Sequence, residues 1–459
     1  MVPGTTREKD DCARRSGRSA LAAALAACCG TAQAGSFDLW GIDTEYQLQT
    51  TYSLATRLKA PHAGIVDSPP SPEIPLPDYL KVPESANYDD GDRNFRDGAL
   101  VNNRLTALGE LHFIKDDYGL LVRGDAFYDD VYHHRNDNDS PQTVNKSGAH
   151  NQFTDIAEYR AGRRARVLDA YAYGSWYLSD DVALNLRVGR HIAAWGESLF
   201  FSGVALAQSP ADATKATVPG ADVKSILLPV NQVSMQLSLG YDWTLLAQYK
   251  LEFQPVELNP VGEYFSVSDV VGPGAEFIWG IENPLYLANL ADINLLSDDV
   301  PEALDLILRL MAPDLPAQDL TDLLGGVLGA LDPILPDLNL PVAGLDQPGT
   351  PRYINVRREH DIKPSDHGQW GLGVKWQMTP ETTLGLYRLR YHNTTPAPVQ
   401  NYGYATLLGS DANPLLTTQA LGLQVPVTYN VRYFDGVDLT ALSFSTALLG
   451  ASIGGEVIY

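Results

Sequence analysis

Hydrophobic and polar positions alternate with a period of two over long stretches of this chain. From Trp40 to Leu54, apolar, aromatic and threonine side chains occupy the even positions, and mostly polar side chains occupy the odd ones. A helix would need apolar residues three and four positions apart, so the pattern predicts a β-strand. The stretch is far longer than the usual strand of about 5–6 residues. It suits a tilted strand that crosses a membrane, which needs about 9–11 residues in the hydrocarbon.

The same alternation returns in pairs of strands joined by short polar turns. The predicted hairpins cover 101–129, 168–188, 233–253, 370–391 and 438–459. Long polar connections separate them at 55–100, 130–163 and 254–366. Short turns at one end and long loops at the other are typical of outer-membrane barrels. Aromatic residues at strand ends, among them Trp176 and Trp376, would form the interfacial girdles of such a barrel.

These strands predict an all-β fold, a transmembrane antiparallel β-barrel with long loops. A soluble β-sandwich or propeller, with the aromatic residues in its core, is the alternative. About eleven strands can be recognised, whereas single-chain bacterial barrels have even numbers. Unpaired strand edges in lipid are costly. Either one strand escapes the pattern, or the barrel is incomplete at the C-terminus.

The N-terminus has the organisation of a secretory signal peptide. A basic flank with three arginines precedes the apolar run 20–27, and 32–34 (Ala-Gln-Ala) matches a cleavage site. We expect a signal peptide at 1–34 and a mature barrel at 35–459, exported to the outer membrane of a Gram-negative cell. A lipoprotein signal, with Cys28 as the acylated residue, is the alternative.

Cysteines and charge narrow the class further. Cys12, Cys28 and Cys29 are the three cysteines and all precede residue 34, so the mature chain could form no disulfide and no thiolate metal site. Removing the signal peptide takes away five basic and three acidic residues and changes the net charge from −23 to −25. Nucleic-acid binding needs a basic surface, so nucleic acid is not an expected partner.

One insertion breaks the alternation. Residues 287–344 are rich in Leu, Asp and Pro, and 300–311 and 320–331 have helical spacing. We expect a loop insertion with short helices, which forms an extracellular cap, a plug folded into the barrel, or a poorly ordered surface loop. A membrane-surface helix would carry Lys or Arg on its polar face, and only Arg309 is present here.

Three blocks of sequence stand out: 87–95 (NYDDGDRNF) with 100–104 (LVNNR), 188–198 (VGRHIAAWGES), and 228–233 (LPVNQV). They resemble a Gram-negative outer-membrane family catalogued as domain of unknown function 1302. Weaker similarity reaches 455–457 (Gly-Glu-Val), so the resemblance covers most of the mature chain except the insertion. It implies a barrel in envelope transport, with hydrophobic compounds as a candidate cargo, and no established substrate or mechanism. Members of the family usually continue by further strands, whereas this chain stops at Tyr459.

The middle block also holds the best cluster of candidate site residues. They are Arg190, His191, Trp195, Glu197 and Ser198. Two glycines within the block allow a bend near the end of a strand. Arg190 and Glu197 could pair near the lumen and narrow it. The alternative is a structural turn held by the same ion pair.

Inward-facing strand positions carry both signs of charge, and we expect them to line a pore. The pore-lining candidates are Arg104, Glu110, Arg123, Asp125, Asp169 and Arg187, together with Arg190, His191 and Glu197. They would either set selectivity or form a solvated wall. A basic run (Arg163, Arg164 and Arg166) would contact lipopolysaccharide or an anionic solute, or form a solvated loop edge.

No motif predicts a catalytic, metal or cofactor site. Asp89-Asp90-Gly91-Asp92 offers oxygen ligands for calcium, but Asx-type turns explain it equally well. The segment 196–200 lacks the last glycine of a nucleophile elbow. His133-His134 has no supporting metal ligands.

We therefore expect a non-enzymatic transport barrel without a cofactor. Its partners would be outer-membrane lipid, lipopolysaccharide and the barrel-assembly machinery. An outer-membrane lipid-modifying enzyme is one alternative, although no suitable spacing of Ser, His and an acid is evident. A structural or adhesive barrel that acts through its loops is the other.

Overall fold

The computed structural model describes residues 31–62, 66, 87, 89–193, 195–197, 203–221, 226–281, 283, 286, 349–448 and 451–459. The expected insertion at 287–344, most of the expected signal peptide and Ser198 lie outside the described residues. In the described part of the chain, none of the helices combines the length and the hydropathy that crossing a membrane requires.

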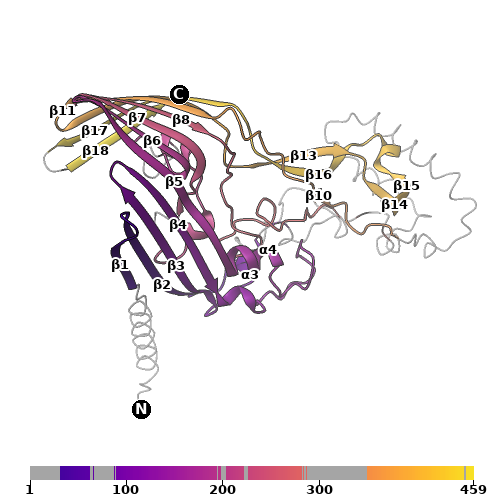
Figure 1. Ribbon diagram of the computed structural model, residues 1–459. Helices are drawn as coiled ribbons and strands as arrows, with labels where there is room; N and C mark the ends of the chain where they lie inside the picture. Colours follow the sequence, from indigo (N-terminus) through magenta and orange to yellow (C-terminus); the bar gives the residue numbers. More distant parts are fainter. Residues whose placement is uncertain are drawn as a thin grey trace, which may run out of the picture.

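Twelve strands form one antiparallel sheet whose order follows the chain. The strands are β1 (Thr31–Asp38), β2 (Asp43–Thr56), β3 (Leu100–Lys115), β4 (Tyr118–Asp129), β5 (Arg163–Ser179), β6 (Val182–His191), β7 (Val230–Leu239), β8 (Trp243–Lys250), β11 (Trp370–Thr379), β12 (Thr382–Tyr391), β17 (Val437–Leu448) and β18 (Ala451–Ile458). Figure 1 shows them as one strongly curved sheet. The all-β class and the predicted hairpins are confirmed.

Short turns gather at one end of this sheet and long connections at the other. The described turns are 39–42, 116–117, 180–181, 240–242 and 380–381. The long connections are 57–99, 130–162, 192–229, 251–369 and 392–436. We call these two ends the turn end and the loop end. Trp40, predicted to begin the first strand, lies instead in the first turn, where its φ is 55°.

β1 is the strand that the alternation did not reveal, because Phe37 is its single large apolar residue. With it the sheet has twelve strands, an even number. Among the described residues, β1 pairs with β2 alone and β18 with β17 alone, so the barrel is open between these two edges. The expected cleavage site lies within β1, and cleavage there would leave 35–38 of the strand. The signal peptide stays a prediction.

The two faces of the sheet differ in polarity. The convex face exposes apolar side chains, among them Leu105, Leu111, Leu372, Leu386, Leu442 and Phe444. Near the turn end, Trp243 of β8 and Trp376 of β11 are paired on neighbouring strands, and their rings stack on each other with centroids 5.5 Å apart. The concave face carries mainly polar and charged side chains, since alternate residues of each strand point to opposite faces.

The loop end supports a second, smaller set of strands (Figure 1). One sheet has the order β13 (Ala397–Gly403), β16 (Val425–Arg432), β10 (Val356–Arg358) and β9 (Phe277–Ile278), and a hairpin joins β14 (Thr406–Ser410) to β15 (Asn413–Thr417). Buried Val356, Tyr429, Val431 and Tyr433 form its core. The helices are short: α3 (Asp90–Arg93), α4 (Asp155–Ala157), α5 (Val204–Gln208) and α6 (Ala213–Ala216), with single turns at Asp130–His133, Glu158–Gly162 and Thr418–Leu421.

Candidate functional site

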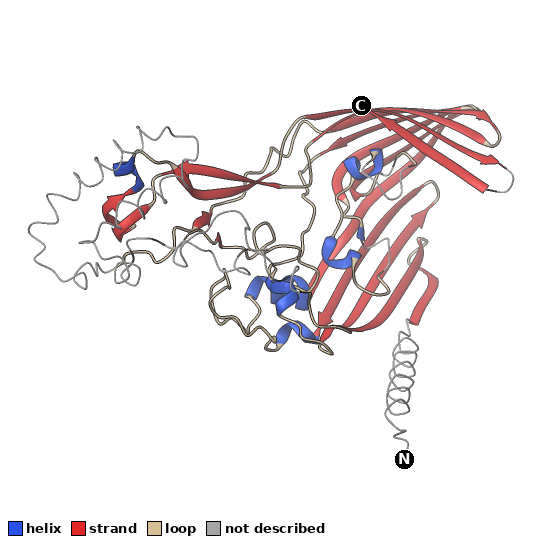
Figure 2. Cartoon of the chain, turned by 180° about the vertical axis from the view of Figure 1, so that it is seen from behind, coloured by secondary structure: helices blue, strands red, loops and turns tan. Residues whose placement is uncertain are grey.

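The connection between β6 and β7 folds back onto the concave face of the sheet. We call residues 195–197 and 203–221 of this connection the inner segment; it contains α5 and α6. Figure 2 shows these two helices against the inside of the curved sheet. The insertion 287–344 was expected as a candidate plug, but this shorter connection is the one that the described structure places there.

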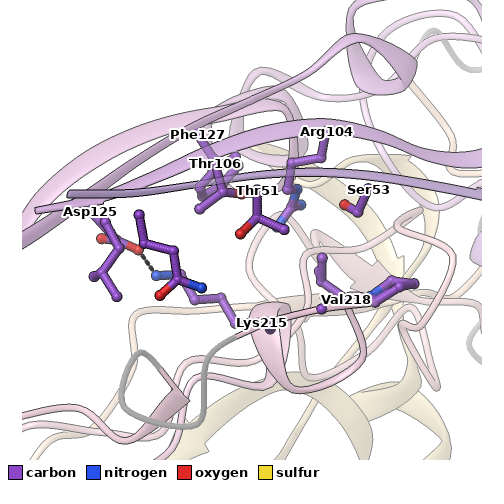
Figure 3. Close-up of a pocket in the computed structure, with 13 residues that line it drawn as sticks. Thr51, Ser53, Arg104, Thr106, Asp125, Phe127, Lys215 and Val218 are labelled. Atoms are coloured by element: carbon purple, nitrogen blue, oxygen red, sulfur yellow. Dashed lines mark ion pairs between the residues drawn. The ribbon is translucent and has the colours of Figure 1, made fainter. Parts of the chain in front are cut away.

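Buried ion pairs fasten α6 to β4 and β5. Asp212 Oδ2 lies 2.8 Å from Arg164 Nη2 and 2.5 Å from Arg166 Nη2. Both arginines also pair with Glu257, at 2.5 Å and 3.3 Å. Lys215 of α6 pairs with Asp125 of β4 (Figure 3). All six side chains are largely shielded from water. A charge in such surroundings is tolerated because it has an opposite charge close by.

Asp212 has two tasks because its two carboxylate oxygens face different groups. Oδ1 accepts hydrogen bonds from the backbone N–H and the hydroxyl of Thr214, at 3.0 Å and 2.6 Å, and so caps the N-terminus of α6. Oδ2 is then left for the two arginines. The same side chain therefore starts the helix and docks it.

A β-bulge explains why Arg166 and Asp169 share the concave face. Val122 pairs with Ala170, but Gly124 pairs with Val167, so β5 has one extra residue at this point. An extra residue reverses the alternation of the strand. In β5, even-numbered residues such as Arg166 point inward before the bulge, and odd-numbered residues such as Asp169 point inward after it. Strict period two would place one of these two charges on the convex face.

A small pocket lies between the inner segment and the concave face of β2, β3 and β4 (Figure 3). Its volume is about 30 Å³, and its lining includes Thr51, Arg104, Asp125, Phe127 and Lys215. A space of this size holds water rather than a solute. The inner segment therefore lies close against this side of the sheet.

Apolar contacts hold α5 against another part of the concave face, formed by β8, β12 and β17. Trp195, Val204 and Ala207 are buried with Leu246, Tyr387, Leu389, Leu439 and Ala441 of β8, β12 and β17. A Cβ at Gly371 would come within 2.9 Å of the Trp195 ring, so glycine makes room for the indole. Lys250 donates a hydrogen bond to the carbonyl of Ala207 at 3.1 Å.

The edge strand β18 also holds the inner segment. The carboxylate of Glu456 accepts the backbone N–H of Glu197 and, at 3.2 Å, that of Val204. The inner segment is thus attached to β4 and β5 on one side and to β8, β12, β17 and β18 on the other. It therefore reaches across the concave face from one group of strands to the other.

Most of the predicted pore-lining residues lie on the concave face. Arg104 pairs with Asp129 at 3.2 Å, Arg123 with Asp169 at 2.5 Å, and Asp125 with Arg166 at 3.2 Å. Glu110 is the register partner of Arg123 on the neighbouring strand. His191 Nε2 lies 2.7 Å from the hydroxyl of Ser234. Arg187 lines a cavity on the concave face of β5 to β8 and β11.

Three sequence predictions need correction. Arg190 does not line the concave space. Arg187 and His191 point inward, so Arg190, at an even position of the same regular strand, points to the convex face. Its guanidinium lies 3.7 Å from Glu252. The pair between Arg190 and Glu197 is therefore wrong, and Glu197 instead donates its backbone N–H to Glu456.

The third correction concerns the basic run in β5. Arg164 and Arg166 do not form a solvated loop edge, because Arg164 is buried and Arg166 half-buried, and both pair with Asp212 and Glu257. Arg163 alone is exposed. Asp212, Lys215 and Glu257 were not predicted, since they lie in the connections between strands, where no alternation marks the side that a charge faces.

A second group of acids lies among the loops. Asp89 caps α3 by accepting the N–H of Gly91 at 2.9 Å, which is the Asx-type turn foreseen as the alternative to calcium binding. Asp269 accepts the backbone N–H of Asp90 at 2.9 Å. In the described part of the chain, no group of three or more His, Cys, Asp or Glu side chains is arranged to hold a metal ion.

These loop acids make the loop end sensitive to pH. Burial and the neighbouring Asp92 raise the pKa of Asp89 to about 7, and burial raises the pKa of Glu263 to about 7. Burial and Asp90 raise the pKa of Asp269 well above its ordinary value. Unfolded carboxyls ionise near pH 4. Between about pH 4 and 7 the unfolded chain loses protons that the folded loops retain, so the stability of the loops falls as the pH rises.

We therefore expect faster amide exchange at 89–95 and 263–269 at pH 8 than at pH 5, after correction for the intrinsic exchange rate. Hydrogen–deuterium exchange measures this directly. Asp269→Asn removes one buried acid and should flatten the profile, whereas Asp97→Asn, at an exposed position, should leave it as it is. Equal protection at both pH values would contradict the prediction.

Comparison with solved structures finds only distant likeness. The siderophore receptor PirA from Acinetobacter baumannii is 11% identical, with a TM-score of 0.28, over 92% of this chain and 42% of that one. The copper transporter OprC is 12% identical, with a TM-score of 0.26, over 94% and 45%. A ferric enterobactin receptor (PfeA) mutant from Pseudomonas aeruginosa is 9% identical, with a TM-score of 0.20, over 93% and 47%. This chain thus spans less than half the length of each.

The comparison with curated proteins finds no match. A family match, by contrast, runs over nearly the whole chain, from residue 15 to residue 459. The middle block of the resemblance (188–198) and the weaker stretch 455–457 meet in the fold, because Glu456 accepts the backbone N–H of Glu197. The chain belongs to the family described as protein of unknown function (DUF1302).

Proposed function

We propose that this protein acts in the outer membrane as a passive transport protein for polar solutes, with the inner segment as its restriction. One observation carries the proposal: the curved sheet is apolar on its convex face and charged on its concave face, where a docked segment lies. Lipid has no hydrogen bonds to offer, so a membrane strand must turn apolar side chains toward it. The concave face then provides a wetted path.

The paired charges on the concave face favour a selective path over a wide pore. Charged walls and loops that narrow a channel decide which solutes enter. Here the pairs among Asp125, Arg166, Asp212 and Lys215 hold the restriction in place and also form part of the wall. Transport by this route needs no catalytic residue, so the protein is proposed to be non-enzymatic.

The proposed cargo is polar. Hydrophobic compounds were the cargo implied by the family resemblance. The polar groups that the concave face offers are hydroxyl, amide, guanidinium, ammonium and carboxylate groups. Lipid and lipopolysaccharide are the proposed surroundings of the convex face, and the barrel-assembly machinery its proposed route of insertion.

Two measurements test this function. Fractionation of cells that express the full chain should place it with the outer membrane. In liposomes, the purified protein should admit small neutral sugars faster than large ones, as measured by swelling in iso-osmotic sugar. Sugar entry at the rate of protein-free liposomes would overturn the proposal, and phospholipid hydrolysis by the same preparation would favour a lipid-modifying enzyme.

A further inference from the structure

A cavity of about 500 Å³ lies on the concave face between β5, β6, β7, β8 and β11. Its wall is partly polar, from Asn185, Ser234 and Thr244, and partly apolar, from Trp195 and Leu246. Unlike the small pocket beside Lys215, it has the volume of a small organic molecule. It lies next to the inner segment, which supplies Trp195.

This cavity has cations in its lining and no carboxylate. Arg187 of β6 and Lys375 of β11 both line it, and no Asp or Glu does. Among the described residues neither cation has a carboxylate within ion-pair distance. The concave face of β3, β4 and β5 differs, since Arg104, Arg123 and Arg166 each pair with an aspartate there.

The absence of acids extends over four neighbouring strands. The inward-facing charged or titratable residues of β6, β7, β8 and β11 are Arg187, His191, Lys250 and Lys375. His191 bonds to Ser234, and Lys250 bonds to the carbonyl of Ala207. That leaves Arg187 and Lys375 as the two cations without such a partner. In a chain of net charge −23, this region is locally positive.

Neutral groups in the cavity can complete an anion site. The hydroxyl of Ser175 donates to Asn185 Oδ1 at 2.7 Å, so the amide group of Asn185 is left with N–H donors for another acceptor. The Arg187 guanidinium lies 5.7 Å from the centroid of the Tyr171 ring, which supports it from one side. A planar guanidinium binds the two oxygens of a carboxylate in parallel.

We propose that this cavity binds a small organic anion, with its carboxylate at Arg187 and its apolar body against Trp195 and Leu246, while Lys375 supplies a second positive charge to the same lining. The inference rests on the proposed transport function, because it names the class of solute that the path would select. Two fixed cations in a confined space raise the local concentration of anions and lower that of cations.

Equilibrium binding tests the site without any transport. Benzoate is the probe, and benzamide, which has the same ring without the charge, is its neutral counterpart. The detergent-solubilised full chain should bind benzoate in a calorimetric titration and bind benzamide at least tenfold more weakly. Added salt should weaken benzoate binding, because the attraction is electrostatic.

The variants separate this site from general surface charge. The double variant Arg187→Gln/Lys375→Gln should lose benzoate affinity at least tenfold. Its matched control is Arg163→Gln/Lys115→Gln, which removes one arginine and one lysine from exposed strand positions outside the cavity. That control should bind as the unmodified chain does. Arg187→Lys/Lys375→Arg keeps both charges and should bind benzoate more tightly than the Gln double variant, because the electrostatic attraction remains. This variant shows whether changed side chains at these two positions still allow a folded site.

The outcomes are distinguishable from those of the transport test. Equal binding of benzoate and benzamide, no binding of benzoate, or unchanged affinity in the Gln double variant would each overturn the anion site, whether or not sugars enter liposomes. Benzoate binding without sugar entry would keep the site and overturn the proposed function. If the anion site and the transport function both hold, the protein in a bilayer with a salt gradient should prefer anions, and the Gln double variant should lose this preference.

Discussion

Replacing Asp212 by Asn is expected to release the inner segment and to raise sugar entry into liposomes several-fold. Asn is as good a helix N-cap as Asp, so α6 keeps its start. The negative charge that Arg164 and Arg166 share is lost, and the Asn amide group would turn N–H donors toward guanidinium groups. Breaking a buried ion pair by removing one partner costs about 3–5 kcal/mol, and the lower end applies here because Glu257 still faces both arginines.

Hydrogen–deuterium exchange at 203–221 reports the release, and swelling reports its effect on permeability. Asp169→Asn is the matched control, since it breaks a buried pair with Arg123 that joins two strands and does not touch the inner segment. The control should leave exchange at 203–221 as it is. Asp212→Asn protein with unchanged exchange and permeability, or a control with the same effect, would show that these ion pairs do not hold the restriction.

Arg104→Met is expected to destabilise the fold by about 3–5 kcal/mol, the cost of leaving one buried charge without its partner. Arg104 is 4% exposed, and its partner Asp129 is fully buried. The guanidinium also donates to the carbonyl of Ala161 at 3.0 Å and lies 4.1 Å from the centroid of the Phe127 ring. Met fills a similar volume and keeps the apolar contact but leaves the carboxylate uncompensated.

Urea unfolding of the vesicle-bound protein measures this cost. The double variant Arg104→Met/Asp129→Asn removes both charges and should recover much of the loss, because the Asn oxygen can still accept the backbone N–H of Asn103. Arg163→Met, at an exposed position of the same sheet, should change stability by less than about 0.5 kcal/mol. A double variant no more stable than Arg104→Met would mean that the unpaired charge is not the cause.

Much of the sheet could be predicted because its constraint is local. Alternating side chains such as those of 101–129 must face lipid or water according to their parity, and the turn at 116–117 lies between two such runs. The prediction failed where the parity changes. At the bulge in β5 one extra residue turns Arg166 and Asp169 to the same side, and β1 has too few apolar residues to show a pattern.

The candidate site was predicted only in part, for the same reason. Arg104, Arg123 and Asp125 lie on regular strands, so their direction followed from their position, although their partners did not. Arg190 lies at the end of β6, and its partner Glu252 comes from beyond β8, far away in sequence. Contacts of this kind depend on which strands become neighbours, which alternation does not encode.

By itself, the sequence determined that this chain forms hairpins with one apolar and one polar face, with short turns at one end and long connections at the other. It also determined that the chain is acidic and that its cysteines lie near the N-terminus. Only the tertiary structure decided that the connection between β6 and β7 lies against the concave face and that arginines of β5 hold it there. It also brought Arg187 and Lys375 to one cavity without an acid. The physical reason is that facing lipid or water is a property of each residue's place in a strand, whereas pairing of charges depends on segments that fold together.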